Sequence, residues 1–259
     1  MINLIEGIYV DNIGNVVYDN KHDNDTDVIK CLNPDIYISE FLGNVYYFGY
    51  TFNDDASRKD RTNVIHWLKN IDSCGISETQ LTQFIDRDLN YANKRLNFSE
   101  FSAILYPRSN RSNITNVIIR EIGNFSQHYT DKISFELIKS LPKNVEFDWE
   151  LFDFNYSGEL FDNQYKQIYD YVENQLMPKI NELDYFSLAD NVKPKYRQYI
   201  KNYLTVDEST SKFISAIKRG KILIVDDINT SGSTLREILR IVQKINNDCE
   251  IYIFTLLGK

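Results

Sequence analysis

The residues with the clearest chemical meaning in this 259-residue chain form one stretch, 221–234, which reads Lys-Ile-Leu-Ile-Val-Asp-Asp-Ile-Asn-Thr-Ser-Gly-Ser-Thr. The branched apolar residues 222–225 predict a short buried strand, and Asp226 and Asp227 stand where that strand is expected to end. A small polar loop follows, and apolar spacing over 235–245 predicts an amphipathic helix. Because the N–H groups and the positive dipole end of a helix attract phosphate, this order predicts an anion site.

The side chains around the predicted anion site divide into donors and acceptors. Gly232 lets the backbone approach a ligand closely. Carboxylates only accept hydrogen bonds and would repel a phosphate, so Asp226 and Asp227 are expected to hold sugar hydroxyls instead. An anion site beside two acceptors suits a ribose 5-phosphate. The hydroxyl donors of the loop are Thr230, Ser231, Ser233 and Thr234.

Residues 225–234 resemble the phosphoribosyl-pyrophosphate motif of the type I phosphoribosyltransferases, in which a hydrophobic strand and two acidic residues precede a loop ending in Thr-Gly-x-Thr or Ser-Gly-x-Thr. The resemblance covers about residues 100 to 259 and is nearest the ComF-like branch, because little follows a last predicted strand at 251–257. That branch commonly carries a four-cysteine zinc module, which the three widely spaced cysteines of this chain cannot form. The family implies an α/β fold with a parallel sheet flanked by helices.

The resemblance also implies a reaction. Phosphoribosyl pyrophosphate is the donor, an unidentified nitrogen acceptor attacks the anomeric carbon, and pyrophosphate leaves. Mg²⁺ is expected as cofactor, bound mainly by substrate oxygens and water rather than by a dedicated protein cage. Asp226 and Asp227 are expected to hold the 2- and 3-hydroxyls of the ribose. The residues implied for its 5-phosphate are Asn229, Thr230, Ser231, Gly232, Ser233 and Thr234.

Cations for the diphosphate are expected from two other segments. Residues 101–106 predict a strand and 114–125 a helix, and the family resemblance makes the loop between them the pyrophosphate loop. A second, mobile loop within 190–197 would close over the diphosphate and exclude water. In both loops, ordinary solvated side chains are the alternative interpretation. The residues expected to act there are Arg108, Ser109, Asn110 and Arg111 in the first loop, and Lys193, Lys195 and Arg197 in the second.

The residue at position 230 limits which nitrogen acceptors are expected. Thr230 stands where 6-oxopurine salvage enzymes of the family usually carry an Asp thought to act as the base. A threonine cannot act as a base at neutral pH, so the hypothesis is that neither hypoxanthine nor guanine is the acceptor. The identity of the acceptor stays open.

The predicted elements divide the chain into an N-terminal α+β unit, residues 1–99, and a phosphoribosyltransferase-like core, residues 100–259. Strands are predicted at 8–17, 45–52, 134–139 and 145–154, and helices at 60–70, from 77, and at 161–183. The first unit resembles nothing specific. It is expected to act either as a hood over the acceptor pocket or as a partner-binding module.

Composition restricts the partners. A net charge of −8 argues against nonspecific nucleic-acid binding, and no apolar stretch approaches the length of a membrane helix, so a cytoplasmic location is expected. Family analogy predicts a homodimer. Two non-enzymatic alternatives remain: a regulator that binds phosphoribosyl pyrophosphate without catalysis, and a protein-interaction scaffold.

Overall fold

The computed structural model describes residues 7–10, 16–19, 29–31, 38–52, 54, 56–69, 75–109, 112–125, 133–156 and 162–258. The chain separates into two compact units, and each is described by itself. Unit 1 contains residues 1–135, 217–230 and 248–259, and unit 2 contains residues 136–216 and 231–247. Both units are therefore built from segments that are distant in the sequence.

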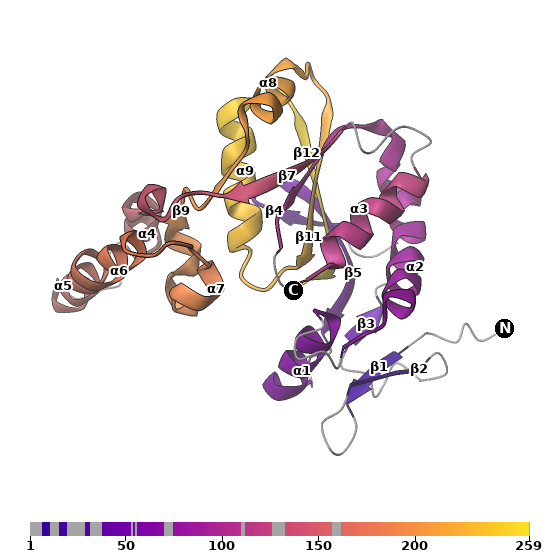
Figure 1. The fold of residues 1–259 in the computed structure, drawn as a ribbon, viewed down its shortest axis with the longest axis horizontal. Coiled ribbons are helices and arrows are strands. Elements are labelled where there is room, and N and C mark those ends of the chain that lie inside the picture. Colours follow the sequence, from indigo (N-terminus) through magenta and orange to yellow (C-terminus); the bar gives the residue numbers. More distant parts are fainter. Residues whose placement is uncertain are drawn as a thin grey trace. The chain divides into compact units, whose positions relative to one another are not determined.

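A central, mostly parallel sheet forms the middle of unit 1 (Figure 1). Four strands run parallel in the order β6, β11, β12, β5, and β3 and β4 pair antiparallel with the free edge of β5. Within the described residues these six strands are β3 (Ile29–Cys31), β4 (Ile38–Phe41), β5 (Asn44–Phe52), β6 (Phe101–Pro107), β11 (Lys221–Ile228) and β12 (Glu250–Gly258). The runs of buried apolar residues in β6, β11 and β12 are typical of parallel strands that are covered on both faces.

Helices cover this sheet because packing against it removes the apolar face of each helix from water. Ser77 and Gln80 form a capping box that starts α2. Tyr50 stacks on Phe84 of α2 with ring centroids 4.0 Å apart, and one hydrophobic core joins α2, α3 and the central strands. The helices of unit 1 are α1 (Arg58–Leu68), α2 (Glu78–Leu96) and α3 (Ile114–Phe125), and its separate hairpin pairs β1 (Gly7–Val10) with β2 (Val16–Asp19).

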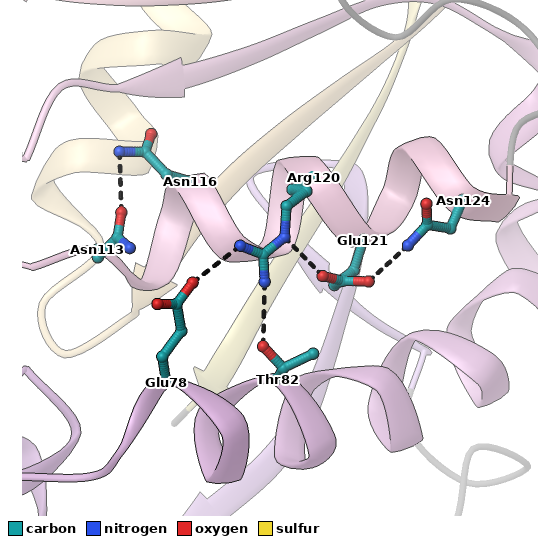
Figure 2. A network of polar contacts seen from close by, with 7 residues as sticks. All are labelled: Glu78, Thr82, Asn113, Asn116, Arg120, Glu121 and Asn124. Carbon is teal, nitrogen blue, oxygen red and sulfur yellow. Dashed lines mark hydrogen bonds and ion pairs between the residues drawn. The ribbon is translucent and has the colours of Figure 1, made fainter.

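Arg120 ties α3 to α2 along their exposed edge, as Figure 2 shows. Its guanidinium donates to Glu78 at 3.0 Å, to Thr82 at 3.0 Å and to Glu121 at 2.8 Å. Glu121 is buried and also accepts a hydrogen bond from Asn124 at 2.6 Å, so its charge is compensated. The network holds the two helices in a fixed register over the sheet.

Unit 2 consists mainly of helices with two short antiparallel strand pairs. An aromatic cluster forms much of its core; Phe152, for example, lies 5.1 Å from Tyr199 between ring centroids. The strand pairs are β7 (Ser134–Lys139), which begins in unit 1, with β10 (Leu204–Thr205), and β8 (Glu146–Phe147) with β9 (Ile200–Lys201). The helices are α4 (Trp149–Tyr156), α5 (Asp162–Tyr171), a π-helical turn (Val172–Leu176), α6 (Met177–Asn181), α7 (Leu188–Asn191), a 3₁₀ helix (Pro194–Tyr199), α8 (Glu208–Ala216) and α9 (Ser233–Ile245). None of the helices that the structure describes has both the length and the apolar composition to cross a membrane.

The predicted α/β class is confirmed, and so are the strands at 45–52, 101–106, 134–139 and 251–257. In place of the one strand predicted at 8–17, the structure has the two strands β1 and β2, which pair antiparallel with each other. Two further expectations also differ from the structure. The strand predicted at 145–154 is only the two-residue β8, because Asp148 accepts a hydrogen bond from the backbone N–H of Leu151 and starts helix α4. The boundary predicted after residue 99 runs through one sheet, since β5 pairs with β12.

A close approach between β5 and α2 generates a test of this packing. Asp88 of α2 is buried, and its carboxyl group occupies the space beside Gly49, where an added Cβ would lie 1.8 Å from Cγ of Asp88. Gly49→Ala is therefore expected to lower the free energy of unfolding by about 1–3 kcal/mol. Asp88→Ala in the same chain should restore part of that loss. Urea unfolding of both single variants and the double variant measures the coupling, and purely additive effects would contradict the contact.

Candidate functional site

Both predicted carboxylates lie inside strand β11 rather than just beyond it. The strand continues through Asp226 and Asp227 to Ile228, and the two aspartates are only 7% and 6% exposed. The two carboxylates have different hydrogen-bond and ion-pair partners. Their burial argues against an interpretation of the pair as two solvated aspartates at the end of a strand.

Asp227 forms an ion pair with Lys69, the residue that ends α1. The Lys69 Nζ lies 2.8 Å from Oδ2 of Asp227, and the two side chains are 27% and 9% exposed. Oδ1 of Asp227 accepts the backbone N–H of Ile228 at 2.6 Å. Burial disfavours the ammonium and is the largest single influence, but the charge and the hydrogen bond of Asp227, together with the charge of Asp226, raise the pKa of Lys69 overall, so that Lys69 stays charged. Sequence reasoning missed Lys69, because a lone lysine at a helix end carries no signal of a partner so distant in the chain.

Asp226 is left with an excess of negative charge around it. Burial and, after it, repulsion by Asp227 raise the pKa of Asp226 to about 7, and the attraction of Lys69 offsets only part of this. Oδ1 of Asp226 accepts a hydrogen bond from the backbone N–H of Asp227 at 2.9 Å. One ammonium for two buried carboxylates is an unfavourable arrangement, and strained electrostatics of this kind concentrate at functional sites.

A chain of polar side chains lies beside Asp226 in unit 1. Thr255 of β12 is its register partner, and the Thr255 hydroxyl lies 2.9 Å from the Tyr46 hydroxyl. The side-chain amide of Asn229 donates to that Tyr46 oxygen at 3.1 Å. Burial raises the pKa of Tyr46 to about 12, so its hydroxyl keeps its proton. Tyr46 is a second site residue that sequence reasoning did not single out.

Asn229 uses its backbone N–H and one side-chain N–H for contacts within unit 1. Its backbone N–H donates to the carbonyl of Leu257 at 2.8 Å, and its side-chain amide donates to Tyr46. Its side-chain oxygen is buried and has no hydrogen-bond partner among the residues that the structure describes. An oxygen acceptor fits a ligand hydroxyl rather than a phosphate.

The remainder of the loop belongs to unit 2 from Ser231 onward. Gly232 has φ 70°, a left-handed conformation that favours glycine, and its carbonyl accepts the Arg236 N–H at 2.9 Å to begin α9. Gly232 stands at the N-cap position and has no side chain that could cap this helix start. The Ser231 and Ser233 hydroxyls lie 2.9 Å apart, and Thr234 is half-buried. The helix start therefore retains the N–H groups that an anion would need.

The residues predicted for the diphosphate are placed as follows. Arg108 and Ser109 are exposed after β6 in unit 1, while Asn110 and Arg111 lie outside the described residues. The other three belong to unit 2 and have local partners: Lys193 and Lys195 lie over the rings of Tyr171 and Tyr196, and Arg197 donates to the carbonyls of Val192 at 2.9 Å and Ala189 at 2.7 Å. Arg197 thus holds the end of α7.

A groove of about 920 Å³ lies within unit 2, between the segments around β10, α8 and α9. Its walls carry charges of both signs, for example Lys143 and Lys244 against Glu146 and Asp207. None of the residues predicted from the sequence lines it. Because its charges offset one another, the groove indicates no class of ligand, and the carboxylate pair remains the stronger candidate.

The electrostatics of Asp226 generate a stability prediction. An ordinary unfolded aspartate has a pKa of about 3.9, whereas burial raises that of folded Asp226 to about 7. Between these two values the folded state therefore holds a proton that the unfolded state lacks. The contribution of Asp226 to the free energy of unfolding is fully present below about pH 4 and is lost as the pH rises through about 7. Asp226→Asn should be more stable than the wild type at about pH 8, by about 1–3 kcal/mol, and should depend less on pH.

Thermal unfolding across this pH range measures both quantities. Asp170→Asn serves as the control, since Asp170 is exposed in unit 2. If Asp226→Asn is less stable than the wild type above neutral pH, the surroundings stabilise the ionised carboxylate. That result would contradict this electrostatic account.

Comparisons with known proteins add no family to this description. No model of a known protein family matches the chain, and no curated protein matches it. The likeness of residues 225–234 to the phosphoribosyltransferase motif therefore stands on those residues and on the buried site around them.

Proposed function

We propose that the chain is a phosphoribosyltransferase that binds phosphoribosyl pyrophosphate with Mg²⁺ and transfers ribose 5-phosphate to a nitrogen acceptor, with release of pyrophosphate. The observation that carries the proposal is the buried pair Asp226 and Asp227 near the carboxyl end of a central parallel strand, followed by a hydroxyl-rich loop and an uncapped helix start. Ligands of open α/β sheets bind beyond the carboxyl ends of the strands. We assign the fold to the type I phosphoribosyltransferase kind on the same grounds.

The roles follow from hydrogen-bonding capacity. Asp226 needs a donor that favours its ionised form, and a ribose hydroxyl supplies one. The buried oxygen of Asn229 is a further acceptor for a sugar hydroxyl. The donors of the 5-phosphate are then the hydroxyls of Ser231, Ser233 and Thr234 and the first N–H groups of α9. The sequence resemblance assigns Asn229 to the 5-phosphate, whereas this proposal assigns its side-chain oxygen to a sugar hydroxyl.

The chain would act mainly by positioning the reactants and by stabilising charge. As the bond between the anomeric carbon and the diphosphate oxygen breaks, positive charge develops on the ribose and negative charge on pyrophosphate. A buried carboxylate beside the ribose stabilises the positive charge, and cations and helix N–H groups stabilise the negative charge on pyrophosphate. Mg²⁺ would arrive with the diphosphate oxygens and neutralise part of their charge.

A non-catalytic protein that binds phosphoribosyl pyrophosphate is the second candidate. The observation that favours it is that the guanidinium of Arg197 already donates hydrogen bonds to two backbone carbonyls. Replacing Lys193, Lys195 and Arg197 by alanine separates the two functions. An enzyme that uses this segment for closure should lose turnover more than binding, whereas a regulator should show no turnover before or after the change.

Binding of the donor gives a direct test of the proposed function. With Mg²⁺ and phosphoribosyl pyrophosphate at about a hundred times Kd, the apparent stability should rise by about 2.7 kcal/mol. For a chain of this size the melting temperature should then increase by roughly 5–10 °C. The double variant Asp226→Asn, Asp227→Asn should show no increase. A thermal shift assay measures both proteins, and the absence of any shift in the wild type would remove the donor from the proposal.

The acceptor gives another prediction. Thr230 is exposed in the loop and offers no base for a purine N–H. Pyrophosphate release is therefore expected to stay at background with hypoxanthine and with guanine, in a coupled assay that detects release with other nitrogen acceptors. Robust turnover of either base would contradict the assignment of Thr230.

A further inference from the structure

Lys69 is a cation in direct contact with the carboxylate pair, and no role follows for it from the sequence. It ends α1, and its Nζ binds Asp227 at 2.8 Å. Its side chain is 27% exposed, so it is not sealed inside the core. An ammonium has three N–H donors, and Asp227 Oδ2 takes one of them.

The donor proposed above brings strong negative charge next to two carboxylates. A diphosphate can lie there only if a cation stands between it and the carboxylates, because like charges in a poorly solvated site repel strongly. The cations expected from residues 193–197 belong to unit 2 and have local partners. Lys69 belongs to unit 1, together with both aspartates, and its contact with Asp227 is already formed.

The connectivity of ribose places the diphosphate near this ammonium. If Asp227 holds the hydroxyl next to the anomeric carbon, the diphosphate oxygen is attached to the neighbouring carbon. A cation bound to the carboxylate of Asp227 then lies beside the bond that breaks. This step rests on the proposed function, because it takes the ribose to be held by the aspartate pair.

We propose that Lys69 bridges Asp227 and the diphosphate of the donor and stabilises the negative charge of the departing pyrophosphate. The new bond joins the acceptor nitrogen to the anomeric carbon, and the electron pair of the broken carbon–oxygen bond goes to pyrophosphate. The proton of the attacking nitrogen passes to water, and Lys69 remains an ammonium throughout. The raised pKa of Lys69 agrees with a group that stays charged.

Two ligands separate this role from a purely structural one. Phosphoribosyl pyrophosphate and ribose 5-phosphate share the hydroxyls and the 5-phosphate, but only the first carries the diphosphate. In Lys69→Met, titration calorimetry with Mg²⁺ should show phosphoribosyl pyrophosphate binding weakened about 10- to 100-fold, which is about 1.4–2.8 kcal/mol. Ribose 5-phosphate binding should change by less than about threefold, which is under about 0.7 kcal/mol.

Two further variants complete the experiment. Lys69→Gln keeps an N–H donor for Asp227 while removing the charge, so it gives the same test if Lys69→Met does not fold. Lys59→Met is the matched control, because Lys59 is an exposed lysine of the same helix. It should bind both ligands like the wild type.

The outcomes distinguish the possible failures. An equal loss of both ligands in the Lys69 variants would show that Lys69 only organises Asp227, and unchanged binding of both would show that it has no role; either result overturns the proposal. If the wild type binds neither ligand, the proposed function itself fails, and the inference fails with it.

Discussion

Two buried carboxylates of β11 share one half-buried ammonium, that of Lys69 at the end of α1, and the chemistry of the site depends on this imbalance. Lys69 neutralises Asp227 at 2.8 Å, while burial and repulsion raise the pKa of Asp226 to about 7. An arrangement with an uncompensated buried charge reduces the stability of the free protein. It becomes favourable when a ligand donates hydrogen bonds to the carboxylate, which is why we regard the pair as a binding site rather than a structural ion pair.

The parallel sheet is what brings the members of the site together. β5, β12 and β11 lie side by side, so that Thr255 is the register partner of Asp226 and lies within hydrogen-bond distance of Tyr46 on β5. These three residues come from distant parts of the sequence. Lys69, at the end of α1, also comes from the residues before the domain boundary expected after residue 99. The first hundred residues therefore supply site residues as well as the strands β3, β4 and β5 of the sheet, a closer involvement than a hood or partner-binding module implies.

The sequence predicted the parts of this structure that depend on local pattern. The apolar run at 222–225, the helix start at Ser77 and the amphipathic spacing after 234 each predict their element, because helix starts and the periodicity of strands and helices are local properties. The contacts of Lys69 and Tyr46 could not be predicted, since they depend on which strands become neighbours. Residues 145–154 show the limit of periodicity itself: apolar residues at 147, 149, 151, 152 and 154 suit a strand or a helix, and the cap at Asp148 decides for the helix.

The central claim is that the carboxylate of Asp226 binds the ribose of phosphoribosyl pyrophosphate. Calorimetric titration with Mg²⁺ and this donor, in two buffers of different ionisation enthalpy, measures the protons exchanged on binding. Because burial raises the pKa of Asp226 to about 7 in the free protein, a sugar hydroxyl that favours its ionised form should cause a net release of protons on binding near pH 7. Asp226→Asn should lack this release. Binding by the wild type with the same proton exchange as Asp226→Asn, or no binding at all, would contradict the claim.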